Sequence, residues 1–349
     1  MNHSFASDNA APLCPEALRA LETANQGAAP SYGDDAVTER AVEAFKELFE
    51  TDCAVYFVST GTAANALALS AFCRSHHAIV CHEGAHLQTD ECGAPEFFTG
   101  GAKLLLVGGA HGKLGPGAVE AVVRRRAGDV HFSKPAALSL TQSTEAGTVY
   151  TGEEVAALAE VCRAHGLRLH VDGARFANAV ASLDVPPRTL TWEAGVDVLS
   201  FGGSKNGMGL SEAVVFFDRD LAKDFEYRRK QAGQLSSKMR FLSAPWPRML
   251  LEGHWLRYAR HANAAAARLA LGLRGLPGVR VLHPIEANAV FLDLPEEVHE
   301  GLSRAWAYHP FEGSGHRFMC SWQTTDAEVQ ALVADLGRLA GGEAAHHMR

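Results

Sequence analysis

Residues 82–86 read HEGAH and match the H-E-x-x-H pattern of zinc proteases. In that pattern the two histidines lie one helical turn apart and bind the metal together, and the glutamate acts as a general base. Here the stretch follows a short apolar run, AIVC (78–81), and Gly84 lies between the histidines. A strand followed by a turn is the expected local structure. A zinc hydrolase that uses His82 and His86 is therefore a remote alternative that requires a helix here and a third ligand.

A stretch of small and hydroxyl residues, STGTAAN (59–65), joins a predicted strand to a predicted helix. Gly61 allows a ligand to approach the backbone closely, and the start of a helix offers free N–H groups and a positive dipole end. This combination is typical of a phosphate-binding site. The same residues could also form an ordinary helix N-cap.

A carboxylate and a lysine follow two later apolar runs. Asp172 ends the run in HVDGAR (170–175), where a buried carboxylate is costly without a cationic partner. An ion pair with Arg175 could supply that partner. Lys205 lies among small residues in LSFGGSKNGMG (199–209), where a lysine can lie against a flat ligand and favour its neutral, nucleophilic form. An exposed loop lysine is the ordinary alternative.

Taken together, these features match the requirements of pyridoxal 5'-phosphate. Its aldehyde forms a Schiff base with a lysine, its pyridine nitrogen stays protonated beside an anion, and its phosphate needs oriented donors. Lys205, Asp172 and the helix start at Gly61 supply these three groups. The sequence therefore predicts a pyridoxal phosphate site with a Schiff base on Lys205.

The elements that must position these residues alternate along the chain. Apolar runs predict strands at 54–58, 78–81, 103–107, 136–142, 167–172, 196–203 and 212–218. Continuous apolar strands between helices are typical of an α/β protein with a mostly parallel sheet covered on both faces, and ligands bind such sheets at the carboxyl ends of the strands. After Pro247 a long alanine-rich helix leads into a shorter α/β pattern. We expect a large domain over 1–247, including the N-terminal segment, and a small C-terminal domain over 248–349.

The composition excludes several other classes of protein. The chain of 349 residues is 47% hydrophobic and 21% charged, as in ordinary globular proteins. Its net charge of -8 argues against a general nucleic-acid binder. Seven cysteines without a C-x-x-C motif suit reduced thiols, and neither a signal peptide nor an apolar run of about 18 residues is found. We expect a cytoplasmic protein that binds neither nucleic acid nor membrane.

As a set, these motifs resemble the low-specificity L-threonine aldolases, which belong to the fold type I, aminotransferase-like pyridoxal phosphate enzymes. The similarity covers nearly the whole chain, from FASDN to HRFMCSW, and its most specific parts are YGDD (32–35), TGTAAN (60–65), GAH (84–86), HVDGAR and SKNGMG. The resemblance implies retro-aldol cleavage of L-threonine, L-allo-threonine or other L-β-hydroxy-α-amino acids, with phenylserine as a candidate, to glycine and an aldehyde. It also implies a mixed seven-stranded sheet. A β-eliminating lyase or an aminotransferase is the alternative, because these enzymes share nearly every site residue.

The resemblance assigns cofactor contacts to residues of the large domain: Ser59, Thr60, Gly61, Thr62, His86, Asp172, Arg175 and Lys205. Asp172 would pair with the pyridine nitrogen, and His86 would stack on the ring. The N–H groups of Gly61 and Thr62 would be the main phosphate donors. A basic residue of a neighbouring subunit, Lys238 or alternatively Arg240, would also reach the phosphate.

The substrate would be held at its carboxylate by Arg317 on a small-domain strand, with Arg175 and Ser7 nearby. Tyr32 would come from the neighbouring subunit, which implies a homodimer or homotetramer with shared active sites.

The chain departs from the family pattern at one position. Many members have a histidine near the substrate hydroxyl, whereas STEAG (143–147) places Glu145 there. The base that takes the hydroxyl proton is therefore His86 or Glu145, and the sequence leaves this choice open. His82 and Glu83 are expected to have structural or rim roles.

Overall fold

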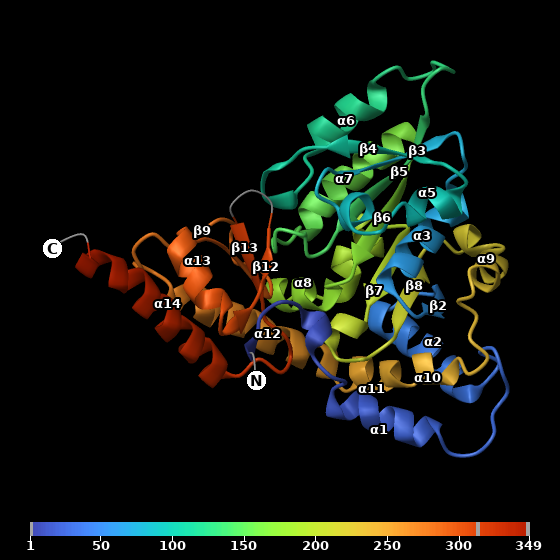
Figure 1. The fold of residues 1–349 in the computed structure, drawn as a ribbon. Helices are drawn as coiled ribbons and strands as arrows, with labels where there is room; N and C mark the ends of the chain where they lie inside the picture. The colour runs from blue at the N-terminus through green and yellow to red at the C-terminus, as the bar shows by residue number, and fades with distance from the viewer. Residues whose placement is uncertain (1–2, 312–314, 347–349) are drawn as a thin grey trace.

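The computed structural model describes residues 3–311 and 315–346, and its centre is a seven-stranded sheet in the order β2-β8-β7-β6-β5-β3-β4 (Figure 1). The strands are β2 (Ala54–Val58), β3 (His77–His82), β4 (Lys103–Val107), β5 (Lys134–Thr141), β6 (Arg168–Gly173), β7 (Val198–Gly202) and β8 (Glu212–Phe216). Only β8 runs antiparallel to its neighbours, β2 and β7; the other pairs are parallel. The mixed, mostly parallel sheet expected from the sequence is confirmed.

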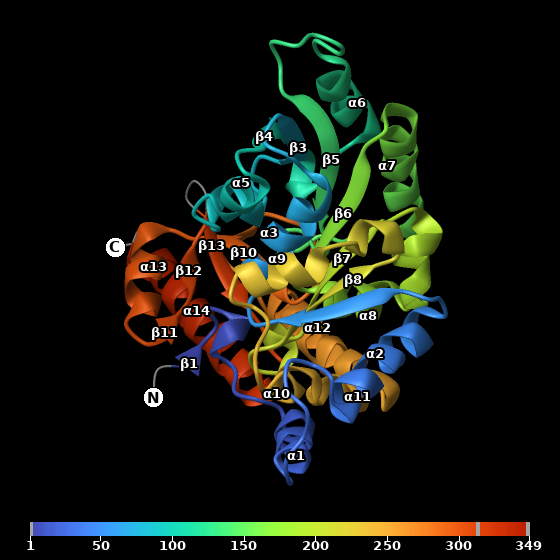
Figure 2. The same cartoon turned by 90° about the vertical axis from the view of Figure 1, so that its right-hand side faces the viewer.

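Helices cover both faces of this sheet (Figure 2). One face carries α3 (Gly61–Phe72), α5 (Ala94–Thr99) and α9 (Phe225–Gln231). The other face carries α2 (Ala36–Phe49), α6 (Pro116–Arg124), α7 (Gly152–His165) and α8 (Phe176–Leu183). Neighbouring strand residues point to opposite faces, so that in β7 Val198 packs with the α3 side and Leu199 with the α2 side. Burial on both faces explains why the strands are continuously apolar.

Local signals in the sequence start and end these helices. At α7 the Thr151 hydroxyl accepts from the Glu154 N–H and the Glu154 carboxylate accepts from the Thr151 N–H, which forms a capping box. Gly166 then ends α7 in the left-handed region, at a φ of 68°. At α3 the Thr60 hydroxyl accepts from the Ala63 N–H, so the helix begins directly after β2.

A smaller sheet in the order β12-β13-β10-β9 forms the second part of the molecule. Its strands are β9 (Arg280–Val281), β10 (Ala289–Asp293), β12 (His309–Pro310) and β13 (Gly315–Met319), and its helices are α13 (Glu296–Ser303) and α14 (Asp326–His346). The long helix α12 (His254–Gly272) is shared, because Trp255 packs in the core of the large part and Leu269 in that of the small part.

The N-terminal segment lies with the small part. Strand β1 (His3–Ser4) pairs in parallel with β11 (Trp306–Ala307), and Phe5 is buried in the small core. Residues 3–5 thus contact the small part, whereas Cys14 and Ala17 pack in the core of the large part. The domain limits 1–247 and 248–349 stay a prediction. The remaining helices are α1 (Pro15–Ala24), α4 (His86–Thr89), α10 (Arg240–Ser243) and α11 (Pro245–Leu251). Among all helices described, none combines the length and apolar character that crossing a membrane requires.

Candidate active site

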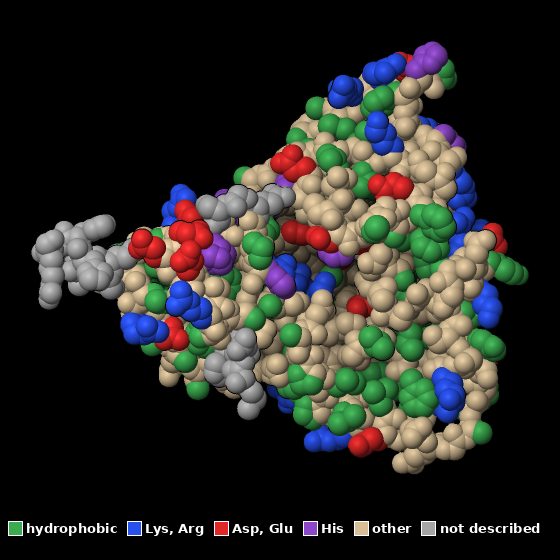
Figure 3. All heavy atoms as spheres, in the orientation of Figure 1, with side chains coloured by type: hydrophobic (Ala, Val, Ile, Leu, Met, Phe, Trp, Pro, Cys, Tyr) green, Lys and Arg blue, Asp and Glu red, His purple; other side chains and the backbone are tan. Residues whose placement is uncertain are grey.

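A cavity of about 860 Å³ opens between the large and small parts. Figure 3 shows the hollow, with acidic, basic and histidine side chains gathered in it. Six of the residues predicted for the active site line it: Ser7, His86, Glu145, Arg175, Lys205 and Arg317. Four of them follow strands β3, β5, β6 and β7 in the chain, so the carboxyl edge of the parallel strands assembles the cavity as expected.

Lys205 lies in a short turn, η5 (Ser204–Asn206), directly after β7. The turn packs closely, because a Cβ at Gly203, the residue just before it, would lie 2.4 Å from the carbonyl oxygen of Ser211. Burial, followed by the positive charge of Arg175, lowers the pKa of the Lys205 amine. Within the described chain the Lys205 amine makes no hydrogen bond or ion pair. These conditions favour a neutral, nucleophilic amine.

Asp172 lies one residue before the end of β6 and is connected to His86 by a chain of hydrogen bonds. Its Oδ1 accepts from the N–H of Ala174 at 3.0 Å, and its Oδ2 accepts from Nδ2 of Asn65 at 2.9 Å. The same Asn65 nitrogen donates to Oε1 of Glu91 at 2.9 Å, and that oxygen lies 2.8 Å from Nδ1 of His86. The sequence reasoning missed Asn65 and Glu91, although Asn65 is part of the TGTAAN motif.

Glu145 lies in the loop after β5 and contacts His86 through the backbone. Its Oε1 accepts from the hydroxyl of Thr141 and from the N–H of His86, both at 2.8 Å. Its Oε2 is buried and has no hydrogen-bond partner among the described residues. Burial raises the pKa of this carboxyl, and the nearby charge of Asp172 raises it further. Glu145 is therefore a carboxyl with one oxygen, Oε2, that is available to a ligand.

Arg175 forms a bidentate ion pair with a carboxylate that the sequence did not reveal. Its Nε lies 2.7 Å from Oδ2 of Asp8, and its Nη2 lies 3.0 Å from Oδ1. Burial alone would raise the pKa of Asp8, but the guanidinium outweighs it and holds that pKa below its usual value.

Arg317 has fewer hydrogen bonds than Arg175. Its Nη2 donates to the carbonyl of Ala6 at 3.3 Å, and its Nε is buried without a partner in the described chain.

The start of α3 presents free donors. The N–H groups of Gly61 and Thr62 have no acceptor within the helix, and a Cβ built on Gly61 would have no atom within 4 Å. The N–H and hydroxyl of Ser59, by contrast, both donate to Oε1 of Gln234 at 2.9 Å. The donors near this helix start are therefore backbone groups of Gly61 and Thr62, and the Ser59 side chain is already engaged.

Residues 4–297 match the model of a family described as beta-eliminating lyase. The chain is 52% identical over 337 residues to a low specificity L-threonine aldolase of a Pseudomonas species (strain NCIMB 10558), covering 96% of this chain and 97% of that protein. It is 53% identical to a low specificity L-threonine aldolase of Pseudomonas aeruginosa, covering 97% and 98%. This chain belongs to the low specificity L-threonine aldolases of the beta-eliminating lyase family. A solved structure of a Leishmania major threonine aldolase superposes with a TM-score of 0.91 at 27% identity, covering 97% of this chain and 99% of that one.

In this threonine aldolase family member the HEGAH stretch is not a helix. Strand β3 ends at His82, and α4 begins at His86. Both ring nitrogens of His82 are engaged, since Nδ1 accepts from the N–H of Gly84 and Nε2 contacts the carbonyl of Gly109, each at 3.0 Å. His82 and Glu83 line the same cavity as His86. The turn expected from the sequence is present, and the two histidines do not share the helix face that a zinc protease needs.

The residues expected to serve a neighbouring subunit lie outside the cavity. Tyr32 is 47% exposed, and its N–H donates to the carbonyl of Ser237 at 3.1 Å. Lys238 is exposed beside it. Arg240 is turned toward α1, where its Nε donates to the carbonyl of Ala24 at 3.1 Å. Lys238 is therefore freer than Arg240 to reach another molecule.

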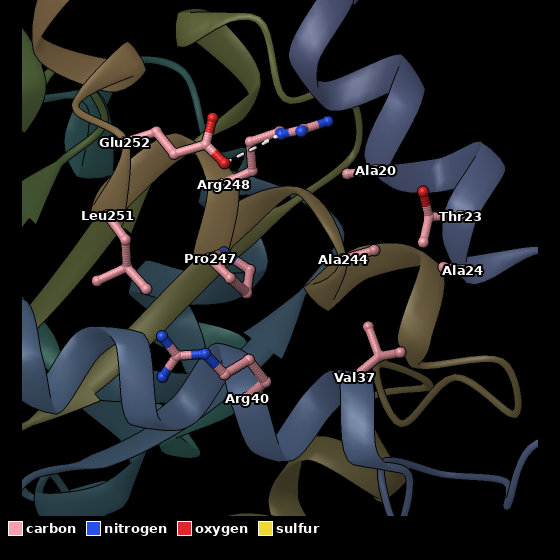
Figure 4. A pocket seen from close by; sticks show the side chains of 10 residues that line it. All are labelled: Ala20, Thr23, Ala24, Val37, Arg40, Ala244, Pro247, Arg248, Leu251 and Glu252. Carbon is pink, nitrogen blue, oxygen red and sulfur yellow. Dashed lines mark hydrogen bonds and ion pairs between the residues drawn. The ribbon is translucent and has the colours of Figure 1, made fainter.

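A second cavity, of about 440 Å³, lies at α1, α2 and α11 (Figure 4). It is lined by Ala20, Thr23, Ala24, Val37, Arg40, Ala244, Pro247, Arg248, Leu251 and Glu252. Arg248 and Glu252 form an ion pair 3.2 Å long at its edge. None of the residues predicted for the active site lines it, so the chemistry is assigned to the larger cavity.

Proposed function

We propose that this protein is a pyridoxal phosphate-dependent aldolase that cleaves L-threonine, L-allo-threonine or related L-β-hydroxy-α-amino acids to glycine and an aldehyde. The observation that carries the proposal is the meeting of Lys205, His86, Glu145 and Arg317 around one cavity. Membership of the threonine aldolase family supports the same reaction.

The residues present fit pyridoxal phosphate. Lys205 is an amine of lowered pKa without a hydrogen-bond partner among the described residues, suited to hold the aldehyde covalently, and the N–H groups of Gly61 and Thr62 suit the phosphate. Each Asp172 oxygen accepts one hydrogen bond in the described chain, so capacity remains for a pyridine N–H. When bound, the cofactor supplies an electron-withdrawing ring that stabilises the charge left on the substrate Cα when the Cα–Cβ bond breaks.

Arg317 is the better candidate for binding the substrate carboxylate. The Nε and Nη2 donors of Arg175 are already directed at Asp8, which leaves fewer donors for a second anion. Arg317 has an unpartnered, buried Nε among the described residues, and a planar guanidinium binds a carboxylate through two donors. Arg175 contributes positive charge nearby, and burial, followed by this charge, lowers the pKa of Arg317.

Two groups can receive the proton of the substrate β-hydroxyl. His86 has Nε2 available because its Nδ1 is engaged by Glu91, and Glu145 has Oε2 available. A general base must lie within hydrogen-bond reach of the proton and have a pKa near the working pH. The pKa of His86 is raised chiefly by the hydrogen bond that its Nδ1 donates to Glu91, and that of Glu145 is raised by burial. Both groups line the cavity and both have raised pKa values, so both are candidates for the base and experiment decides between them.

A second copy of the chain is proposed to complete the site. The support for this is that Tyr32 and Lys238 are exposed side by side, away from the cavity of their own chain. Mixing two inactive variants, Lys205→Ala and Tyr32→Phe, tests the idea. Activity that appears on mixing supports shared sites in a dimer or tetramer, whereas no recovery together with a monomeric mass contradicts them.

The reaction itself is tested by incubating the cofactor-loaded protein with L-threonine and with L-phenylserine. Glycine and an aldehyde in equal amounts are expected, and Lys205→Ala is expected to abolish both the products and the visible absorption band of the bound cofactor. Lys223→Ala is the matched control, because Lys223 is exposed and pairs with Asp220 on the surface. Ammonia with the corresponding oxo acid would instead identify a β-eliminating lyase, and an oxo acid formed without ammonia, in the presence of an amino-group acceptor, would identify an aminotransferase.

A further inference from the structure

The hydrogen-bond chain from His86 to Asp172 contains a buried carboxylate to which the proposed reaction assigns no role. The side chain of Glu91 is 0% exposed, whereas the ring of His86 is 38% exposed. Glu91 lies in the turn between α4 and α5, and its carbonyl accepts from the N–H of Ala94 at 2.9 Å. The turn positions the backbone of Glu91, and hydrogen bonds to Asn65 and His86 hold its carboxylate.

The orientation of Asn65 follows from charge. Its amide nitrogen donates to Oε1 of Glu91 and to Oδ2 of Asp172, both at 2.9 Å. The reverse orientation would place the amide oxygen against two carboxylates, which can only accept when ionised. One amide group thus separates two buried acids and ties them to each other.

The same reasoning locates the proton between Glu91 and His86. Oε1 of Glu91 lies 2.8 Å from Nδ1 of His86, and the imidazole is normally the stronger base of the two. A proton placed on Oε2 of Glu91 would be buried without an acceptor in the described chain, which is costly. The proton therefore resides on Nδ1, and Nε2 is the free ring nitrogen.

We propose that Glu91 is a positioning residue that holds His86 with Nδ1 protonated and Nε2 free for the substrate, and that Asn65 couples this pair to Asp172. The use of Nε2 on a substrate rests on the proposed aldolase function; the tautomer does not. The charged groups that face His86 are Glu91, Asp172 and Glu145, which are acidic, and Lys205, which is basic. Glu91 is the acid that is hydrogen-bonded to the ring, so removing its charge is expected to change the titration midpoint of His86 more than removing any of the others.

The tautomer is tested by nitrogen NMR on cofactor-loaded protein with 15N-labelled histidine rings. The His86 signals are identified by their loss in His86→Asn. Nδ1 carrying the proton above the His86 pKa is the expected result. Protonation at Nε2 under those conditions would overturn the proposal without any Glu91 variant being needed.

Glu91→Gln tests the effect of the charge. The glutamine keeps an acceptor for Nδ1 but removes the negative charge, so the titration midpoint of His86 is expected to fall by about one pH unit or more. Glu252→Gln is the matched control, because it removes another glutamate–histidine pair, to His254 at 3.0 Å, outside the site. An unchanged His86 midpoint in Glu91→Gln would overturn the proposal.

The pH profile of activity adds a catalytic readout. If His86 is the base, the acid limb of kcat/KM moves down in Glu91→Gln by the same amount as the NMR midpoint. If the NMR midpoint of His86 falls but the acid limb of kcat/KM does not move, the Glu91–His86 pairing is supported and Glu145 is the base. Absence of glycine formation in the wild type would refute the aldolase function and leave the NMR result to decide the pairing.

Discussion

Replacing Asp8 with asparagine removes the negative charge from the most buried ion pair of the site. The Asp8 side chain is 1% exposed and that of Arg175 is 15% exposed. Asp8 accepts from Arg175 at 2.7 and 3.0 Å and from Nδ2 of Asn288 at 3.1 Å. Asparagine has nearly the same shape but one acceptor oxygen fewer, and it leaves the guanidinium of Arg175 without a counter-charge.

The expected loss in the free energy of unfolding is about 3 kcal/mol. Breaking a buried ion pair from one side typically costs about 3–5 kcal/mol, and the hydrogen bond that asparagine can still accept places Asp8→Asn at the lower end. Urea unfolding of the cofactor-saturated protein measures the change. Asp220→Asn is the control, because Asp220 pairs with Lys223 at the surface and its loss should leave the midpoint unchanged.

The pH dependence of this loss has a definite sign. The folded pKa of Asp8 lies below its usual value of 3.8, because Arg175 outweighs the opposing effect of burial. The stability contributed by the charged pair is therefore fully present above about pH 4 and is lost as the pH falls through the folded pKa. The gap between wild type and Asp8→Asn should be constant from neutral pH to about pH 4 and shrink below it. Equal midpoints at neutral pH, or a gap that widens in acid, would refute this reasoning.

Three further predictions concern the site and its support. Glu145→Gln should lower kcat by about 10²–10⁴-fold if Glu145 is the base, and unchanged activity in a product assay would remove it from that role. Arg317→Lys should raise the KM for L-threonine by about tenfold or more, because lysine cannot offer two parallel donors; steady-state kinetics with Arg338→Lys as the surface control measures this. Burial raises the pKa of Glu212 to about 7; the carboxyl accepts from the N–H of Gly203 at 2.7 Å. The stability that protonated Glu212 gives the wild type is fully present below about pH 4.5 and is lost as the pH rises toward 7. The urea midpoint of Glu212→Gln should therefore rise relative to that of the wild type across this window. A difference between the two midpoints that stays constant with pH would contradict the prediction.

Much of the fold could be predicted because the determinants are local. Each predicted strand of the large sheet overlaps an observed one, and 54–58 and 103–107 match β2 and β4 to the residue. A buried parallel strand has a continuous apolar run, and its carboxyl end is where a polar residue such as Asp172 or Lys205 becomes conspicuous. The two-residue strands β1 and β11 could not be predicted, because their pairing depends on residues about 300 positions apart.

The partners of the site residues were less accessible to sequence reasoning than the residues themselves. Asp8 meets Arg175 across 167 positions, and Asn65 meets Asp172 across 107, so no spacing rule connects them. A physical signal did exist at Asp172, since a carboxylate ending a buried strand requires a partner. The nearest cation in the sequence, Arg175, was the natural choice, yet it pairs with Asp8, and Asp172 is satisfied by the amide of Asn65.

The pairing of Asp172 with Asn65, in place of Arg175, bears on the chemistry. Had Arg175 paired directly with Asp172, the carboxylate would have been neutralised by a guanidinium at the place proposed for the pyridine nitrogen. A neutral amide donor holds Asp172 in place through one hydrogen bond and leaves its charge uncompensated at short range. Asp8 meanwhile engages two donors of Arg175.

Because Asn65, and not a cation, holds Asp172, Asn65→Asp should weaken cofactor binding more than Asn65→Ser. A third carboxylate would repel Asp172 and Glu91, whereas serine keeps one donor. Cofactor titration followed by absorbance measures the difference, and equal affinities in the two variants would contradict the role given to the amide.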